Sequence, residues 1–160
     1  MMKRTLISVL ALVACFVGIQ AQTQVIAHRG FWKTEGSAQN SITALEKAAE
    51  AQLYGSEFDV LMTSDGTIVV NHDNTIEGMA IPETPFKKLK KLKIKNGEKL
   101  PTLKSYLKKG KKLDIQLILE AKPLPTKEME DQAIATIVKM VKKMGLEKQV
   151  EYISFSLNMC

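Results

Sequence analysis

Two carboxylates, two positions apart, stand inside a stretch that has the pattern of a buried strand. The segment YGSEFDVLM, residues 54–62, places Glu57 and Asp59 on either side of Phe58. Because successive side chains of a strand point to opposite faces, the two acids share one face and Phe58 takes the other. Buried like charges repel, and each is costly to desolvate unless a cation compensates it. The pair therefore predicts a metal, a basic partner or water at that face.

Other ionisable residues follow further apolar runs. His28 and Arg29 come after VIA, His72 comes after IVV, and Glu120 and Lys122 belong to LILEAK. A single histidine after a strand is ordinarily a hydrogen-bonded structural residue. Two histidines and three acids at strand ends are harder to explain in that way. Functional groups of parallel α/β folds gather where strands end, so these residues are candidates for one site.

Strand and helix patterns alternate along the chain and would position these groups. Apolar runs predict strands at 24–30, 56–63, 67–73, 115–122 and 150–156. Helical spacing predicts helices at 40–52, with Asn40 or Ser41 as the N-cap, and at 126–145. The alternation favours βαβ units and a largely parallel sheet in a single α/β domain.

The positive charge is concentrated in one segment. The segment from Lys87 to Lys112 contains 12 of the 23 basic residues and one acid, Glu98, so its net charge is +11. Since the whole chain has a net charge of +6, the other residues together carry −5. The plainer interpretation is two solvated helix faces, FKKLKKLK and TLKSYLKKGKK, with their leucines turned inward. The sharper one is a basic surface that attracts anionic phosphoesters or a membrane. Nucleic acid is disfavoured, because only Tyr106 offers a stacking platform there.

The first 21 residues have the layout of a secretory signal peptide. MMKR is followed by an apolar run from Thr5 to Ile19, which is short of the about 20 residues that a membrane span needs. We expect cleavage after Ala21 and an exported protein, periplasmic or secreted. The alternative is a lipid anchor at Cys15, in LVAC. If Cys15 is removed, Cys160 is the only cysteine and no internal disulfide can form.

Five blocks, in order, resemble the glycerophosphodiester phosphodiesterase family. They are AHRG at 27–30, SEFDV at 56–60, SDGTIVVNHD at 64–73, LPTL at 100–103 and LILEAK at 117–122. The resemblance covers the chain from about Val25 to its end and implies a TIM-barrel (β/α)₈ fold. Such a barrel takes about 250 residues. We therefore expect residues 22–160 to be a partial domain, a barrel truncated to about its first five strands.

The resemblance also implies a reaction and a role for seven residues. The family hydrolyses glycerophosphodiesters to glycerol 3-phosphate and an alcohol with the help of one divalent cation. By resemblance, His28 and His72 are the general acid and base, Arg29 and Lys122 bind phosphate, and Glu57, Asp59 and Glu120 bind the metal. Three carboxylates suit Ca²⁺ or Mg²⁺ rather than zinc. Which histidine is the acid stays open, as does the alcohol.

The chain departs from the family pattern at positions 39 and 41, near these residues. The family commonly has Glu-Asn-Thr where this chain has Gln39, Asn40 and Ser41, so one charge is missing. Two alternatives stay open. One is a phospholipase D-like enzyme of the same superfamily that acts on lipid head groups, and the other is a non-catalytic or unstable fragment.

Overall fold

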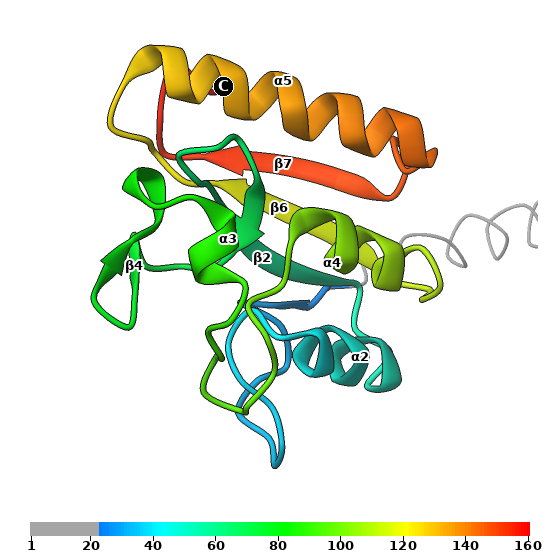
Figure 1. The fold of residues 1–160 in the computed structure, drawn as a ribbon. Coiled ribbons are helices and arrows are strands. Elements are labelled where there is room, and N and C mark those ends of the chain that lie inside the picture. The colour runs from blue at the N-terminus through cyan, green and yellow to red at the C-terminus, as the bar shows by residue number, and fades with distance from the viewer. Residues whose placement is uncertain (1–22) are drawn as a thin grey trace, which may run out of the picture.

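The computed structural model describes residues 23–160, which are built around one mixed sheet (Figure 1). Its strands are β1 (Ile26–Ala27), β2 (Gly55–Met62), β3 (Ile68–Val70), β6 (Gln116–Ala121) and β7 (Val150–Ser154). The order β1-β2-β6-β7 is parallel throughout, whereas β3 pairs with β2 in the antiparallel sense. The predicted signal peptide and Cys15 lie outside the described residues.

Three helices cover one face of the sheet. They are α2 (Ile42–Glu50), α4 (Leu103–Gly110) and α5 (Lys127–Met144). Each starts at a side-chain cap, because Ser41, Thr102 and Thr126 each accept a hydrogen bond from the backbone N–H three residues later. The apolar faces of the helices meet alternate residues of the strands, and Phe58 of β2 stacks on Tyr106 of α4 at 4.3 Å between ring centres. None of the helices in residues 23–160 is long and apolar enough to cross a membrane.

The opposite face of the sheet carries the acids. Since Phe58 points into the helix layer, its neighbours Glu57 and Asp59 point the other way, as the alternation predicts. The stretch at 67–73 was expected to join a largely parallel sheet, but β3 returns antiparallel to β2 through the tight turn at Ser64 to Gly66. The short connection explains the difference, because only an antiparallel partner can be reached by a hairpin.

β1 and β3 lie end to end on the same edge of β2, because β6 occupies the other edge. β1 runs parallel to β2 and β3 runs against it, so the two strands point toward each other. Between them, the backbone N–H groups of Gly30 and Asn71 donate to the carbonyls of Glu57 and Asp59, each at 3.1 Å. The residues that follow β1 and β3 therefore lie beside the two acids.

A separate layer lies at the side where the parallel strands end (Figure 1). It contains β4 (Thr75–Ile76), β5 (Met79–Ala80), the 3₁₀ helix η1 (Ile81–Glu83) and α3 (Phe86–Leu89) around a second small core. The segment FKKLKKLK was expected to be helical, yet α3 is a single turn. Beyond it Leu92 and Ile94 alternate with exposed lysines, and Lys93 forms an antiparallel bridge with Lys99. The second lysine-rich segment does form a helix, α4.

Candidate active site

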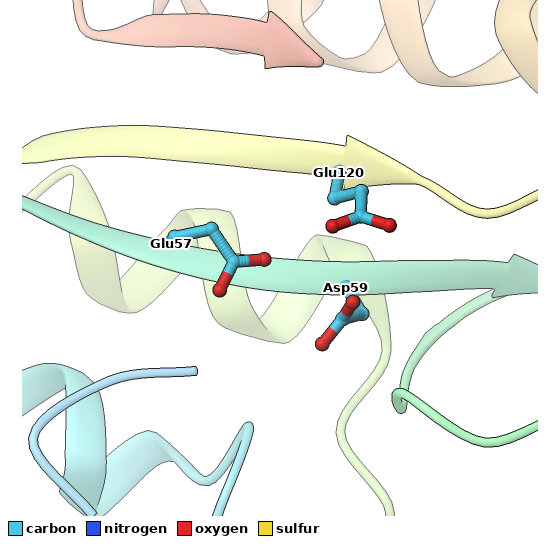
Figure 2. A group of neighbouring side chains, drawn as sticks. All are labelled: Glu57, Asp59 and Glu120. Carbon is cyan, nitrogen blue, oxygen red and sulfur yellow. The ribbon is translucent and has the colours of Figure 1, made fainter. Parts of the chain in front are cut away.

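Three carboxylates lie together on the open face of the sheet (Figure 2). Glu57 and Asp59 come from β2, and Glu120 comes from β6, where it is the direct register partner of Asp59. One oxygen of each residue lies within 4.8 Å of the other two, and all three side chains are buried. Their closeness follows from strand pairing alone, because paired residues of neighbouring strands point to the same side.

The burial and the negative charge of these three carboxylates favour a bound cation. Glu57 Oε1 and Asp59 Oδ1 are buried and accept no hydrogen bond within the described structure. Burial raises the pKa of Glu57 to about 7, and the negative charge of Asp59 adds to the rise. A buried, unsatisfied carboxylate oxygen is costly, and three carboxylates are the donor set that Ca²⁺ or Mg²⁺ prefers. The acids at 57, 59 and 120 therefore fit a divalent cation.

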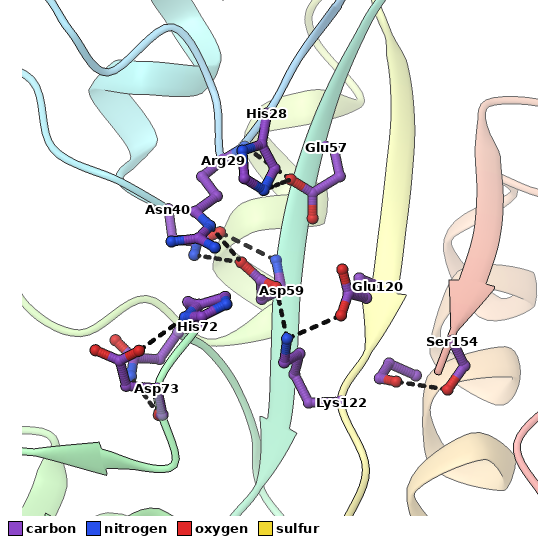
Figure 3. Close-up of polar contacts among 12 residues, drawn as sticks. His28, Arg29, Asn40, Glu57, Asp59, His72, Asp73, Glu120, Lys122 and Ser154 are labelled. Atoms are coloured by element: carbon purple, nitrogen blue, oxygen red, sulfur yellow. Dashed lines mark hydrogen bonds and ion pairs between the residues drawn. The ribbon is translucent and has the colours of Figure 1, made fainter. Parts of the chain in front are cut away.

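The turn after β1 brings His28 and Arg29 to the acids (Figure 3). Arg29 has a positive φ of 59°, and its backbone N–H donates to Glu57 Oε2 at 2.7 Å. His28 Nε2 lies 3.9 Å from the same oxygen, and its side chain is 70% exposed. Gly30 makes this turn possible, because a Cβ at its position would stand 2.6 Å from the Cβ of Ala44 in α2.

Two basic side chains flank the acids (Figure 3). Lys122, just past β6, donates to Glu120 at 2.9 Å and lies 3.6 Å from Asp59 Oδ1. The Arg29 Nε lies 3.7 Å from Asp59 Oδ2, and its Nη1 donates to Gln39 Oε1 at 3.0 Å. Both basic side chains are largely buried, so their charges are weakly screened and contribute strongly to the potential of the site.

His72 follows β3 and lies beside the acids without an ion pair to them. Its Nδ1 is 2.7 Å from Asp73 Oδ1, and this contact orients the ring. His72 lines a cavity of about 290 Å³ together with Gln39 and Asn40. The structure therefore brings six of the seven predicted residues into one contact network and places His72 at its rim, in the adjoining cavity.

Asn40 also belongs to this network, although it is not among the seven predicted site residues. It has a positive φ of 61°, its Nδ2 donates to Asp59 Oδ2 at 2.9 Å, and its Oδ1 accepts from the Asp59 backbone at 3.0 Å. The cap of α2 is the next residue, Ser41. Two sequence signals point to Asn40: it matches the asparagine of the family's Glu-Asn-Thr pattern, and an asparagine is compatible with a left-handed turn.

Comparison with known proteins finds one family that matches most of the chain. Residues 28–160 match the family model described as the glycerophosphoryl diester phosphodiesterase family. A glycerophosphodiester phosphodiesterase from Caldanaerobacter subterraneus subsp. tengcongensis is 37% identical over 94 residues, which cover 51% of this chain and 38% of that protein.

Two solved structures share the fold. A glycerophosphodiester phosphodiesterase from Parabacteroides distasonis is 54% identical, with a TM-score of 0.84, over 86% of this chain and 58% of that one. A phosphodiesterase from Oleispira antarctica, solved with its product sn-glycerol-3-phosphate, is 27% identical, with a TM-score of 0.75, over 86% of this chain and 59% of that one. The likeness confirms the predicted TIM-barrel type of α/β fold. The chain spans less than two thirds of the length of these relatives.

Proposed function

Because the chain belongs to the glycerophosphoryl diester phosphodiesterase family, we propose that its site hydrolyses glycerophosphodiesters to glycerol 3-phosphate and an alcohol. The observation that carries the proposal is the buried trio of Glu57, Asp59 and Glu120, flanked by two basic side chains and a histidine. A phosphodiester is an anion that repels nucleophiles, and this arrangement, with a divalent cation on the three acids, would supply the positive charge that its hydrolysis needs.

The acidic and the basic side chains would have different roles in binding the phosphate. A divalent cation on Glu57, Asp59 and Glu120, Ca²⁺ or Mg²⁺, would neutralise charge that develops on the non-bridging oxygens. Lys122 now donates to Glu120 and would turn toward the phosphate once the acids are compensated. The backbone N–H of Arg29 donates to Glu57 and its Nε lies beside Asp59, and from this position its guanidinium would bind the same oxygens.

His28 and His72 would move the protons. One imidazole takes the proton of the glycerol 2-hydroxyl, whose oxygen then bonds to phosphorus. The bond to the alcohol breaks, and the leaving oxygen takes a proton from the other imidazole. Water then opens the cyclic phosphate. Histidine suits both steps because it titrates near neutral pH. Contact with Asp73 occupies Nδ1 of His72 and leaves Nε2 to react, while His28 is exposed beside Glu57.

The test is the release of glycerol 3-phosphate from glycerophosphocholine and glycerophosphoethanolamine by the purified protein. We expect release with Ca²⁺ or Mg²⁺ and none with EDTA, and a loss of at least about 100-fold in His28→Ala and in His72→Ala. Circular dichroism and metal titration serve as controls, because neither histidine holds the fold or the cation. Unchanged rates in both variants, or release that ignores EDTA, would contradict the proposal.

The substrate separates this proposal from the phospholipase D-like alternative. The lysines between 87 and 112 would help an enzyme that works on a membrane, and those at 93 and 95 line the cavity beside His72. We favour deacylated diesters, since the acids lie in a site that is largely buried. Activity on glycerophosphocholine but not on phosphatidylcholine vesicles is the expected result, and the reverse would favour the lipid enzyme.

We also propose that the protein is exported. The charged start, the apolar run from Thr5 to Ile19 and the small residue Ala21 support this. N-terminal sequencing of the protein from its native host tests it. A start at Gln22 supports cleavage by signal peptidase, a blocked start at Cys15 supports the lipid anchor, and an intact Met1 contradicts export by either route.

A further inference from the structure

We propose that the lysine-rich segment from Lys87 to Lys99 is a docking surface for a membrane that carries anionic lipids. It holds the protein beside a lipid surface while the site acts on deacylated diesters. A glycerophosphodiester is a phospholipid without its acyl chains, so the class of reaction that supplies this substrate is the deacylation of membrane lipids. The docking itself is a binding property of the folded protein and does not depend on hydrolysis.

The lysines of this segment are exposed and have no acidic partners. Seven lysines lie between residues 87 and 99, in the separate layer at the side where the parallel strands end, and all seven are exposed (Figure 1). Leu89, Leu92 and Ile94 pack into the second small core, so the lysines point outward from the layer. None of the ion pairs that form among residues 23–160 involves these seven lysines.

The acids of the same layer do not cancel its charge. Glu98 accepts hydrogen bonds from the first turn of α2, and Asp73 contacts His72. With all four acids counted against the seven lysines, residues 73–99 keep a net charge of +3. The four acids are Asp73, Glu77, Glu83 and Glu98. Outside 87–112 the chain carries −5, so its charge is asymmetric and turns the lysine-rich segment toward an anionic surface.

A tryptophan lies at the end of the lysine-rich segment. Trp32 and Lys95 line the same cavity, which has a volume of about 330 Å³. The side chain of Asn96 donates to the carbonyl of Gly36 at 3.2 Å and ties the loop after β1 to the segment. Lys33 Nζ lies 5.4 Å from the centre of the Trp32 ring. A tryptophan among lysines is typical of surfaces that bind at the interface of an anionic membrane.

The spread of the lysines favours an extended anion over a small one. They are distributed from the single turn of α3 to the extended stretch beyond it, so one phosphodiester can contact only a few of them. Lys93 and Lys95 line the cavity that contains His72, which brings the docking surface to the edge of the site. Single-stranded nucleic acid is bound on a series of exposed rings, whereas Tyr106, the ring among the lysines at 87–112, is fully buried.

Vesicle binding tests the inference directly. The purified protein is mixed with vesicles of phosphatidylcholine, or of equimolar phosphatidylcholine and phosphatidylglycerol, in EDTA, so that no metal ion bridges the acids to the lipid. We expect at least about tenfold tighter binding to the anionic vesicles and a loss of this preference in about 0.5 M NaCl. Trp32 is the only tryptophan in the sequence, and its emission should shift to shorter wavelength on binding.

Matched charge changes locate the docking surface. The double variant of Lys88→Gln and Lys90→Gln removes two exposed charges from the segment without touching the cavity, and we expect it to bind anionic vesicles about tenfold more weakly. The double variant of Lys139→Gln and Lys142→Gln removes the same charge from exposed positions of α5, and it should stay within about threefold of wild type. Circular dichroism confirms that both variants fold.

The outcomes separate this inference from its alternatives and from the proposed function. A loss of binding confined to the first double variant, with a shift of the Trp32 emission in wild type, supports the docking surface. Equal losses in both variants, binding that leaves the Trp32 emission unchanged, or tighter binding to a DNA duplex than to the vesicles would overturn it. No diester is present in the assay, so a protein that docks but hydrolyses nothing contradicts only the proposed function.

Discussion

At the scale of single residues, the site depends on side chains that hold the acids as much as on the acids themselves. Asp59 is buried between Asn40, Arg29 and Lys122, and only Asn40 contacts both its carboxylate and its backbone. A ligand held at two points needs little reorganisation when a cation binds. Partners of this kind typically contribute as much to metal affinity as a weak ligand does.

Replacing Asn40 with alanine should therefore weaken the metal site. We expect Asn40→Ala to lower Ca²⁺ affinity by about 10- to 100-fold, because Asp59 loses both hydrogen bonds. Calorimetric titration of Ca²⁺ measures the change. Asn158→Ala removes an asparagine that donates to Asp131 at an exposed position, and it should bind Ca²⁺ like wild type. Equal affinities in the two variants would show that Asn40 does not support the site.

Gly30 should tolerate no side chain, for two reasons that can be separated. Its φ is 77° and a Cβ would collide with Ala44, whereas Gly78 has a φ of 76° and open space around it. Gly78→Ala should cost about 1 to 2 kcal/mol for the left-handed backbone. Gly30→Ala should cost about 1 to 3 kcal/mol more for the clash. Urea unfolding of both variants measures the difference, and equal losses would contradict the packing argument.

The ionisable residues of the site could be predicted from their type and position in the sequence, whereas the contacts that hold them in place could not. Glu57, Asp59 and Glu120 could be found because acids in a strand are unusual and strand alternation fixes their face. The family pattern singles out positions 39 to 41, but the hydrogen bonds of Gln39 with Arg29 and of Asn40 with Asp59 could not be predicted, because the partner of a loop amide depends on the tertiary fold. The rise in the pKa of Glu57 also depends on burial that no local pattern reveals.

At the scale of elements, the start of α2 is tied to the lysine-rich segment by one carboxylate. Glu98 accepts hydrogen bonds from the backbone N–H groups of Ile42 and Thr43, in the first turn of α2, and from the Asn96 side chain. Burial alone would raise the pKa of Glu98, but the hydrogen bonds from Thr43, Asn96 and Ile42 outweigh it and lower the pKa. The loop that carries Gln39 is thereby held next to the cavity rim.

This contact predicts a pH-dependent contribution to stability. A carboxyl group whose pKa is lower when folded stabilises the protein above its unfolded pKa, and the stabilisation is lost as pH falls through the folded value. We expect Glu98→Gln to lower the free energy of unfolding by about 1 kcal/mol at pH 7 and by less at pH 3. Urea unfolding at both pH values measures it.

The other end of α2 provides a matched control for that prediction. Glu50 is exposed in the last turn, where a negative charge is unfavourable. Glu50→Gln should therefore be neutral or slightly stabilising at pH 7. A loss of stability in Glu98→Gln that is the same at pH 3 and pH 7 would show that its charge is not what holds α2.

Most elements could be predicted because their signals are local. The cap and the apolar spacing at 126–145 give α5 almost to the residue, and the strands at 56–63 and 115–122 are found as β2 and β6. The antiparallel direction of β3 follows from its short connection to β2 at Ser64 to Gly66, whereas the single turn of α3 is harder to predict. A longer helix would satisfy the same apolar pattern, but Leu92 and Ile94 pack against the second core from an extended segment.

At the scale of the whole molecule, the described residues leave an apolar margin beside β7. Ile153, Phe155 and Leu157 are 45%, 83% and 96% exposed, and within residues 23–160 β7 pairs only with β6. Exposed apolar side chains on an open sheet edge favour association. We therefore expect the protein to associate through this margin.

Charge placed on that margin should reduce association. We expect the double variant Phe155→Lys and Leu157→Lys to shift the sedimentation profile toward monomer at the same protein concentration. Val138→Lys changes an apolar residue that is 47% exposed on α5 and does not belong to this margin, so it should leave the profile unchanged. Equal effects of the two changes would show that net charge, rather than the margin, controls association.

The register of Asp59 with Glu120 would couple cation binding at this site to the folding equilibrium. Glu57 and Asp59 are near neighbours in the chain, but Glu120 is distant in sequence and reaches them only when β6 pairs with β2. A cation that needs all three oxygens binds the folded chain and not the unfolded one, so it would stabilise the fold by mass action. The free concentration of that ion around the protein would then govern how long the chain survives proteolysis, independently of any substrate.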